Sequence, residues 1–126
     1  YDLRTYFNDV DIASNNDSLT FTVFANSRPG TVTTSINSAG LLTLGLVADQ
    51  NGTAAITIRA TDEAGLFVDN VLTVNVTPVA DTPRLVQPVG NRTINEDAAP
   101  IVINLVPTHF FDPDVNTNGD TLTITA

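Results

Sequence analysis

This chain of 126 residues is 42% hydrophobic and only 15% charged, a composition that supports a packed core and argues against disorder. Its 14 acidic residues outnumber its five basic residues, and the net charge of −9 disfavours nucleic acid and anionic membranes while it favours metal cations. The sequence has no Cys, which excludes disulfides, thiolate metal sites and Cys nucleophiles.

The first elements of the chain predict short strands separated by turns, and no segment predicts a helix. In residues 19–23, apolar side chains alternate with Thr, as they do on a strand with one buried face. Residues 31–36 and 41–46 predict a hairpin, because the turn-forming residues 37–40 lie between them.

Two longer strands follow. Ala and Ile alternate with other residues over 54–60, which predicts one buried face, and residues 72–76 predict the partner strand. Residues 78–83 form a stiff connector, because Pro fixes φ and restricts the residue before it. We place the domain boundary there, so that 1–80 belong to one domain and 81–126 to the next. Further strands are predicted around residues 85–86, 92–95 and 101–105.

The chain repeats one element, an oxygen-rich loop that leads into an alternating strand. Residues 5–23 and 108–126, which are 103 residues apart, are identical without gaps at 9 of 19 positions. That period is the usual size of one domain, so the sequence predicts tandem domains that the chain cuts mid-domain. The identities lie at acidic loop positions and strand positions: Thr5, Phe7, Asp9, Asp11, Asn15, Asp17, Leu19, Thr20 and Thr22.

The second acidic loop offers oxygen atoms at alternate positions, namely at Asp112, Asp114, Asn116, Asn118 and Asp120. This pattern suits Ca²⁺, which takes about six to eight oxygen ligands. It is not an EF-hand, because Thr117 and Thr123 replace the Gly and the closing Glu of that motif. The first copy offers Asp9 and Asp11 but has Ala13 at the third position. A solvated turn held by Asx side chains is the alternative, and both interpretations stay open.

Several motifs follow one another in a recognisable order. They are an Asn-Glu-Asp before a strand, a Phe with Asp-x-Asp, a Gly-Leu-Leu-Thr-Leu strand, an Ala-Thr-Asp-x-x-Gly turn and a terminal Val-x-Val, at residues 95–97, 110–114, 40–44, 60–65 and 74–76. This order resembles cadherin-like domains, most closely the bacterial and dystroglycan-type cadherin-like repeats, over nearly the whole chain. The resemblance implies an all-β fold, a Greek-key β-sandwich of the immunoglobulin-like and cadherin-like type. On that template residues 1–80 lack their first strands, and residues 84–126 supply the first strands of the next repeat.

The resemblance also implies calcium sites between consecutive domains. The ligands it carries over are Glu96, Asp112 and Asp114 from the second copy, Asp81 from the connector, and Asp62 from the first copy. The family connector usually holds two Asp, whereas this connector holds one. We therefore expect weak binding, in the range of about 10⁻⁴–10⁻³ M that is typical of extracellular modules.

The sequence shows no catalytic constellation. His109 is the only His, so neither a His-based dyad nor a His-rich metal site is possible, and Tyr6 takes its position in the first copy. We expect no enzymatic activity. We instead expect a structural repeat of an extracellular, secreted or cell-surface protein, which serves as an adhesin stalk, spacer or filament segment.

The expected partners are adjacent repeats of the same protein, or neighbouring copies that add a strand such as residues 92–105 to the incomplete domain. The alternative function is a carbohydrate-binding module that binds surface glycans. Sugar-binding faces stack rings on Trp or Tyr, and this chain has no Trp and only two Tyr, so the spacer is preferred. No apolar run approaches the length of a membrane span, and we expect no membrane insertion.

Overall fold

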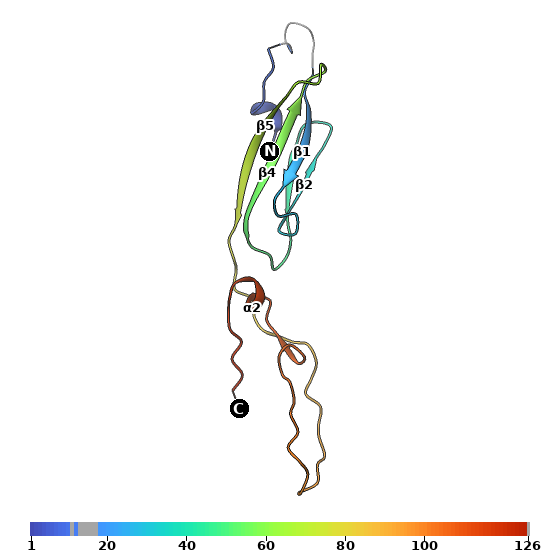
Figure 1. Cartoon of the computed structure of the whole chain (residues 1–126), viewed down its shortest axis with the longest axis vertical. Coiled ribbons are helices and arrows are strands. Elements are labelled where there is room, and N and C mark those ends of the chain that lie inside the picture. Colours follow the sequence, from blue (N-terminus) through green and yellow to red (C-terminus); the bar gives the residue numbers. More distant parts are fainter. Residues whose placement is uncertain (11, 13–17, 126) are drawn as a thin grey trace. The chain divides into compact units, whose positions relative to one another are not determined.

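The computed structural model describes residues 1–10, 12 and 18–125. The chain forms two compact units, Tyr1–Pro78 and Val79–Ala126. Strands in antiparallel sheets make up most of the regular structure, which confirms the all-β prediction (Figure 1). In the part of the chain that the structure describes, the strands are accompanied by helical turns that the sequence did not predict, among them η1 (Leu3–Thr5) and α2 (Asp114–Thr117).

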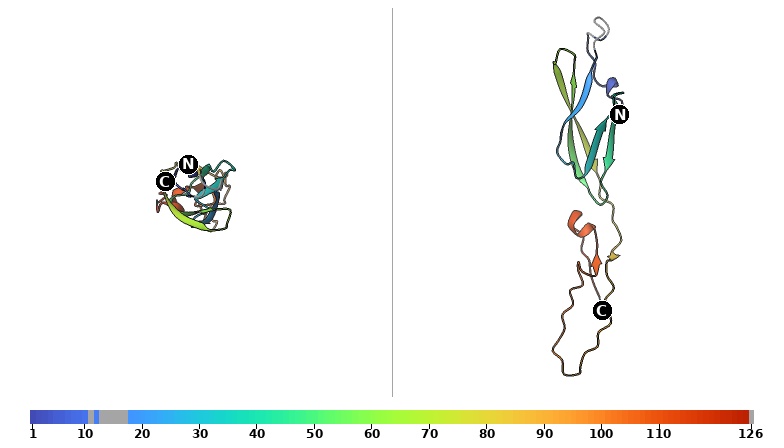
Figure 2. Two further views of the ribbon diagram at one scale, coloured as in Figure 1. Left: turned by 90° about the horizontal axis from the view of Figure 1, so that it is seen from above. Right: turned by 90° about the vertical axis from the view of Figure 1, so that its right-hand side faces the viewer.

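The described residues of the first unit form two sheets, which Figure 2 shows from the side. One sheet has the strand order β1-β4-β5 and the other pairs β2 with β3, and all of these pairs are antiparallel. The predicted hairpin and the predicted pairing of the two long strands are confirmed, although the last strand begins earlier than expected. The strand bounds are β1 (Thr20–Asn26), β2 (Val32–Ile36), β3 (Leu42–Leu46), β4 (Gly52–Thr61) and β5 (Phe67–Val76).

The core of the first unit is centred on β4. Val32 of β2 and Leu42 of β3 belong to the same buried cluster as β4 and expose 0% and 2% of their surface. Burying a side chain of this size contributes about 1.5–3 kcal/mol relative to leaving it exposed. The alternation in the sequence predicted the inward face of β4 correctly, and its four members expose at most 5% of their surface: Ala54, Ile56, Ile58 and Ala60.

The turn between β2 and β3 has a specific chemical basis. The side-chain oxygen of Asn37 accepts the backbone N–H groups of Ala39 and Leu41, both at 3.0 Å. Gly40 follows with a φ of 75°, where an added Cβ would lie 3.3 Å from the ring of Phe21. The turn therefore requires Asn as a side-chain acceptor and Gly for its backbone conformation.

The first residues of the chain pair with the edge of β3 that faces away from β2. The amino group of Tyr1 donates to the carbonyl oxygen of Leu42 at 2.8 Å, and the N–H of Leu42 donates back to Tyr1 at 2.8 Å. The N–H of Leu3 donates to Gly40 at 3.0 Å, and its side chain is buried. The sequence did not predict this short antiparallel segment, because three residues carry too little periodicity.

The second unit contains one short ladder, in which β6 (Arg84–Leu85) pairs antiparallel with β7 (Phe110–Phe111). The strands predicted at residues 92–95, at 101–105 and after the second acidic loop do not form among the described residues. Residues 86–109 instead form two long arms without regular structure (Figure 1). A strand needs a neighbour that completes its hydrogen bonds, and apolar alternation alone does not supply one.

Candidate metal-binding site

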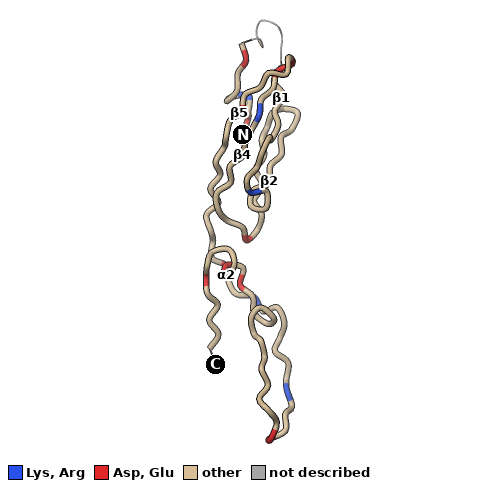
Figure 3. Tube along the Cα trace, viewed as in Figure 1, with Lys and Arg blue, Asp and Glu red and all other residues tan. Residues whose placement is uncertain are grey.

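The second acidic loop begins where β7 ends. Phe111 closes β7, and Asp114 is the first residue of α2. Pro113 stands between the two Asp of the loop and takes a φ of −57°, which suits the start of a helix. Asp112 and Asp114 are both buried, with 5% and 3% of their surface exposed. Figure 3 shows acidic residues in red around α2.

Hydrogen bonds hold both buried carboxylates in place. A carboxylate oxygen of Asp112 accepts the backbone N–H of Asp114 at 3.0 Å. The two oxygens of Asp114 accept the backbone N–H of Asp81 and a side-chain N–H of Asn118, each at 2.5 Å. Burying a carboxylate is unfavourable unless it is hydrogen-bonded, and bonds to an ionised acceptor are among the strong ones. These donors therefore make the burial of two acidic side chains tolerable.

Asp120 completes a group of three carboxylates. One oxygen from each of Asp112, Asp114 and Asp120 lies within 4.8 Å of the others. Asp120 is exposed, and its carboxylate accepts the N–H of Thr121 at 2.7 Å. No Arg forms a salt bridge with these three side chains in the part of the chain that the structure describes.

The group has the chemistry of a site for a hard cation. Two like charges about 4 Å apart repel by about 1 kcal/mol in water and by about 4 kcal/mol at an effective dielectric constant of 20. A divalent cation replaces this repulsion with attraction, and carboxylate oxygens are the ligands that Ca²⁺ and Mg²⁺ prefer. The three Asp side chains can therefore bind a metal ion.

The two amides expected as ligands differ in their placement. Asn118 contacts the group through the N–H bond to Asp114, whereas Asn116 lies in α2 and is exposed. Oxygens at alternate positions converge only in an extended loop. In a helical turn, residues two positions apart point to different faces, so the turn separates Asn116 from the carboxylates.

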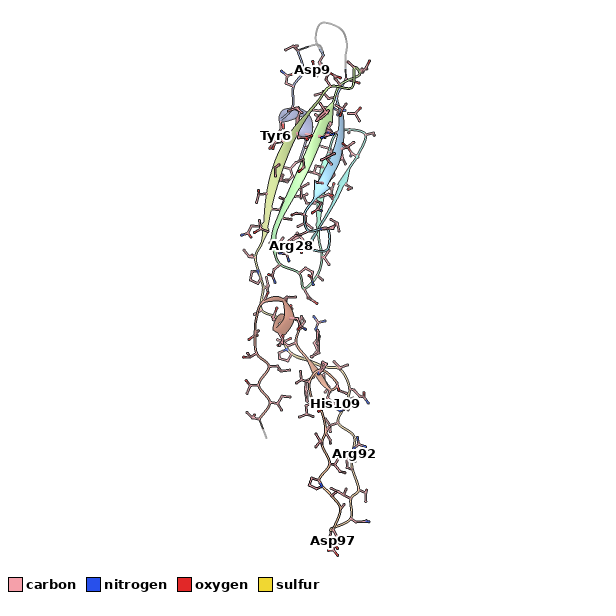
Figure 4. All side chains as sticks on the ribbon, in the orientation of Figure 1. Tyr6, Asp9, Arg28, Arg92, Asp97 and His109 are labelled. Carbon is pink, nitrogen blue, oxygen red and sulfur yellow. The ribbon has the colours of Figure 1, made fainter. Side chains whose placement is uncertain are left out.

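The residues carried over from the family resemblance are not all brought together. Asp81 contributes its backbone N–H to Asp114, and its side chain is not part of the carboxylate group. Glu96 lies in the exposed turn Asn95–Ala98, where Figure 4 labels its neighbour Asp97 at the end of the arms. Glu96 is therefore not one of the three converging carboxylates.

The remaining candidates belong to the first unit. Asp62 lies at the turn after β4, and its carboxylate accepts the N–H of Leu66 at 2.8 Å. Asp9 follows η1, and its expected partner Asp11 lies outside the described residues. The arrangement of the first acidic loop is therefore not described, and the prediction of a metal there stays a prediction.

His109 connects the two strands of the second unit. Its Nδ1 lies 2.8 Å from the carbonyl oxygen of Gln87, and its backbone oxygen accepts the N–H of Val86 at 2.7 Å. The side chain is buried with 9% of its surface exposed. Both contacts join His109 to backbone groups of residues 86 and 87, so the arrangement is a structural one.

Sequence reasoning missed one cluster on the outer face of the first unit. The guanidinium of Arg59 lies 3.9 Å from the ring centre of Phe24 and 3.7 Å from that of Phe67. It also donates two hydrogen bonds to Asp69, at 2.7 and 2.8 Å, which lower the pKa of that carboxyl group. The signal in the sequence was the outward position of Arg59 on β4, but its partners come from two other strands.

Comparisons of the chain with family models, with curated proteins and with solved structures find no match. Among the described residues, no helix has the length and apolar character needed to cross a membrane.

Proposed function

We propose that this chain is part of a structural tandem repeat, a cadherin-like Greek-key sandwich of an extracellular surface or secreted protein. The observation that carries the proposal is the recurrence of one loop in two units. The loop that brings Asp112 and Asp114 together has its copy around Asp9, directly before the strand that opens the first sheet. Repeated units of this kind act as spacers, stalks or filament segments, and their partners are the adjacent repeats.

The strand order of the first unit supports the sandwich topology. In an immunoglobulin-like sandwich, strands C, F and G form one sheet, and strand E lies between B and D in the other. The order β1-β4-β5 fits C-F-G, and the pair β2-β3 fits D-E. The short segment Tyr1–Leu3 pairs with the edge of β3 where strand B belongs.

Calcium gives the repeat its proposed stiffness. Without a cation the three carboxylates of the second unit repel one another. With a cation they become its ligands, from the residue that follows β7, from the start of α2 and from the residues after α2. The backbone N–H of Asp81 already ties Asp114 to the connector. An ion bound by these carboxylates would therefore hold the connector against α2.

A calcium titration of the full chain tests this proposal. At about 10 mM calcium, roughly a hundred times a dissociation constant of about 10⁻⁴ M, binding to the folded state adds about 2.7 kcal/mol of stability. We expect a higher melting temperature in calcium than in excess chelator, and heat on titration. Asp120→Asn, which changes the exposed ligand, should weaken both effects. Asp97→Asn in the exposed turn makes the same charge change and should leave them unaltered.

Identical melting curves in calcium and chelator, together with no heat of binding, would show that the loop is only a solvated turn. If Asp120→Asn and Asp97→Asn reduce the melting-temperature shift and the heat of binding equally, the effect of calcium depends on the net charge of the chain and not on this site.

A structural role is preferred to the other functions for specific reasons. Phe24 and Phe67 are exposed aromatic residues that a sugar could stack on, but each presents a face to the guanidinium of Arg59. A glycan would have to compete with that contact. An enzymatic role has no support from a nucleophile and base pair, since the chain lacks Cys and His109 bonds to a backbone carbonyl.

A further inference from the structure

The sequence contains two places where an Asn is followed directly by Gly, Asn51–Gly52 and Asn118–Gly119. At such a step the Asn side chain can lose ammonia through attack by the backbone nitrogen of the next residue. Gly favours this reaction, because it has no Cβ to hinder the approach of its nitrogen. The surroundings of the two steps differ, and they decide which step can react in the folded chain.

The step Asn51–Gly52 is held by the first unit. Gly52 is the first residue of β4 and pairs with Val76 of β5, and Asn51 is half-buried. Gly52 takes a φ of 116°, and the guanidinium of Arg28 fills the space in which a Cβ would lie. Movement of the Gly52 nitrogen toward the Asn51 side chain would therefore open the end of the β4–β5 ladder and displace Arg28.

The step Asn118–Gly119 is exposed and follows the end of α2. The backbone N–H groups of Asn118 and Asp120 both donate to the carbonyl oxygen of Asp114, at 2.9 and 3.3 Å. Among the described residues, the N–H of Gly119 between them donates to no acceptor. Gly119 has a φ of 71° and no atom within 4 Å of an added Cβ. Its nitrogen can therefore move toward the Asn118 side chain without opening a ladder.

We propose that Asn118–Gly119 is a self-modification site, at which the amide of Asn118 is converted to a carboxylate. The nitrogen of Gly119 attacks Cγ of Asn118. The N–Cγ bond forms, the Cγ–Nδ2 bond breaks, and Nδ2 leaves as ammonia with the proton of the Gly119 N–H. Water then opens the cyclic imide. Cleavage of the N–Cγ bond gives Asp, and cleavage between the nitrogen and the backbone carbonyl carbon gives isoaspartate with a free α-carboxylate.

The conversion reverses the chemistry of one contact in the candidate metal site. The side-chain amide of Asn118 donates a hydrogen bond to a carboxylate oxygen of Asp114 at 2.5 Å. An ionised carboxylate at position 118 has no proton to donate, and it adds a like charge beside Asp112, Asp114 and Asp120. Without calcium the loop is therefore less stable after conversion. With calcium the new carboxylate is a further oxygen ligand, and affinity rises with the number of ligand charges.

This inference deepens the proposed function, and only its calcium arm rests on that proposal. The conversion itself is measured in chelator and does not involve calcium. A chain that binds calcium and keeps Asn118 intact would overturn this inference alone. A chain that converts Asn118 and never binds calcium would overturn the proposed calcium function and leave the modification site in place.

Peptide mass spectrometry of the full chain, kept in chelator at mildly alkaline pH, tests the site. We expect Asn118 to be converted at least about tenfold faster than Asn51, because reaction at Asn51 requires local opening of the ladder. In concentrated urea, where neither step is protected, the two rates should be equal. The variant Asn118→Gln keeps an amide but must close a larger ring, so it should abolish the conversion at this position. Equal rates in the folded chain, or an intact Asn118, would overturn the proposal.

The variant Asn118→Asp reproduces one product and tests the consequence. In chelator it should melt at a lower temperature than the parent chain, and in calcium titrations it should bind at least about tenfold more tightly. Asn95→Asp makes the same charge change in the exposed turn of the arms and should match the parent chain in both measurements. Equal effects of the two variants would show that only net charge matters, and would overturn the role of position 118 in the site.

Discussion

The substitution Ile56→Ala should destabilise the first unit more than truncation to Ala of any other side chain on β4. Ile56 is fully buried at the centre of the three-stranded sheet, between Asn26 of β1 and Leu72 of β5. The change removes about three methylene equivalents, or about 2.4 kcal/mol of transfer free energy. Neighbours on both sides hold the site open, so a cavity penalty adds to this loss and brings it into the range of about 2–5 kcal/mol.

That loss is large for a unit of this size. At about 0.05–0.15 kcal/mol per residue, a unit of 78 residues has about 4–12 kcal/mol of stability. The melting temperature should therefore fall by at least about 10 °C, measured by circular dichroism. The control is Val71→Ala on β5, where a side chain that is 57% exposed should cost less than about 1 kcal/mol. Similar shifts in the two variants would refute the assignment of the core.

Two further outcomes follow from local geometry and charge. Gly40→Ala should lower the melting temperature, because a positive φ of 75° and a close contact with Phe21 oppose a Cβ, whereas Gly90→Ala meets no neighbouring atom and should be neutral. The hydrogen bonds and charge of Arg59 hold the pKa of Asp69 below 3.8, so the pair stabilises the unit above that pH, and its contribution is lost as pH falls through the folded-state pKa. Asp69→Asn should reduce this acid sensitivity in melting curves recorded above and below pH 3.8, and an unchanged profile would show that the pair does not contribute.

The sequence predicted the strands of the first unit well because each strand and turn has a local signal in the sequence. The alternation of Ile56 and Ile58 with polar neighbours determines both the strand and its buried face, and Asn37 and Gly40 determine the hairpin turn. What it missed depends on contacts between distant segments. The pairing of Tyr1 with Leu42 and the contact of Arg59 with rings from two other strands have no local signature.

The candidate site was predicted in part for a related reason. The composition of the loop located Asp112, Asp114 and Asp120. Several carboxylates in a short segment indicate a cation site in either a helical or an extended backbone. The local backbone decided the rest. The helical turn after Pro113 turns Asn116 away from the carboxylates. Glu96 lies in the exposed turn at the end of the arms. The positions of these two residues in the sequence therefore did not predict their distances from the three Asp side chains.

The arms of the second unit expose an apolar segment that is bounded by features which limit the pairing of strands. Residues 101–106 are bounded by Pro100 and Pro107, and Pro has no N–H with which to extend a ladder. Glu96 and Asp97 place two negative charges at the exposed turn, where like-charged copies repel. The prolines limit the length of any ladder that residues 101–106 can form, and the charges at the turn disfavour open-ended stacking of the arms.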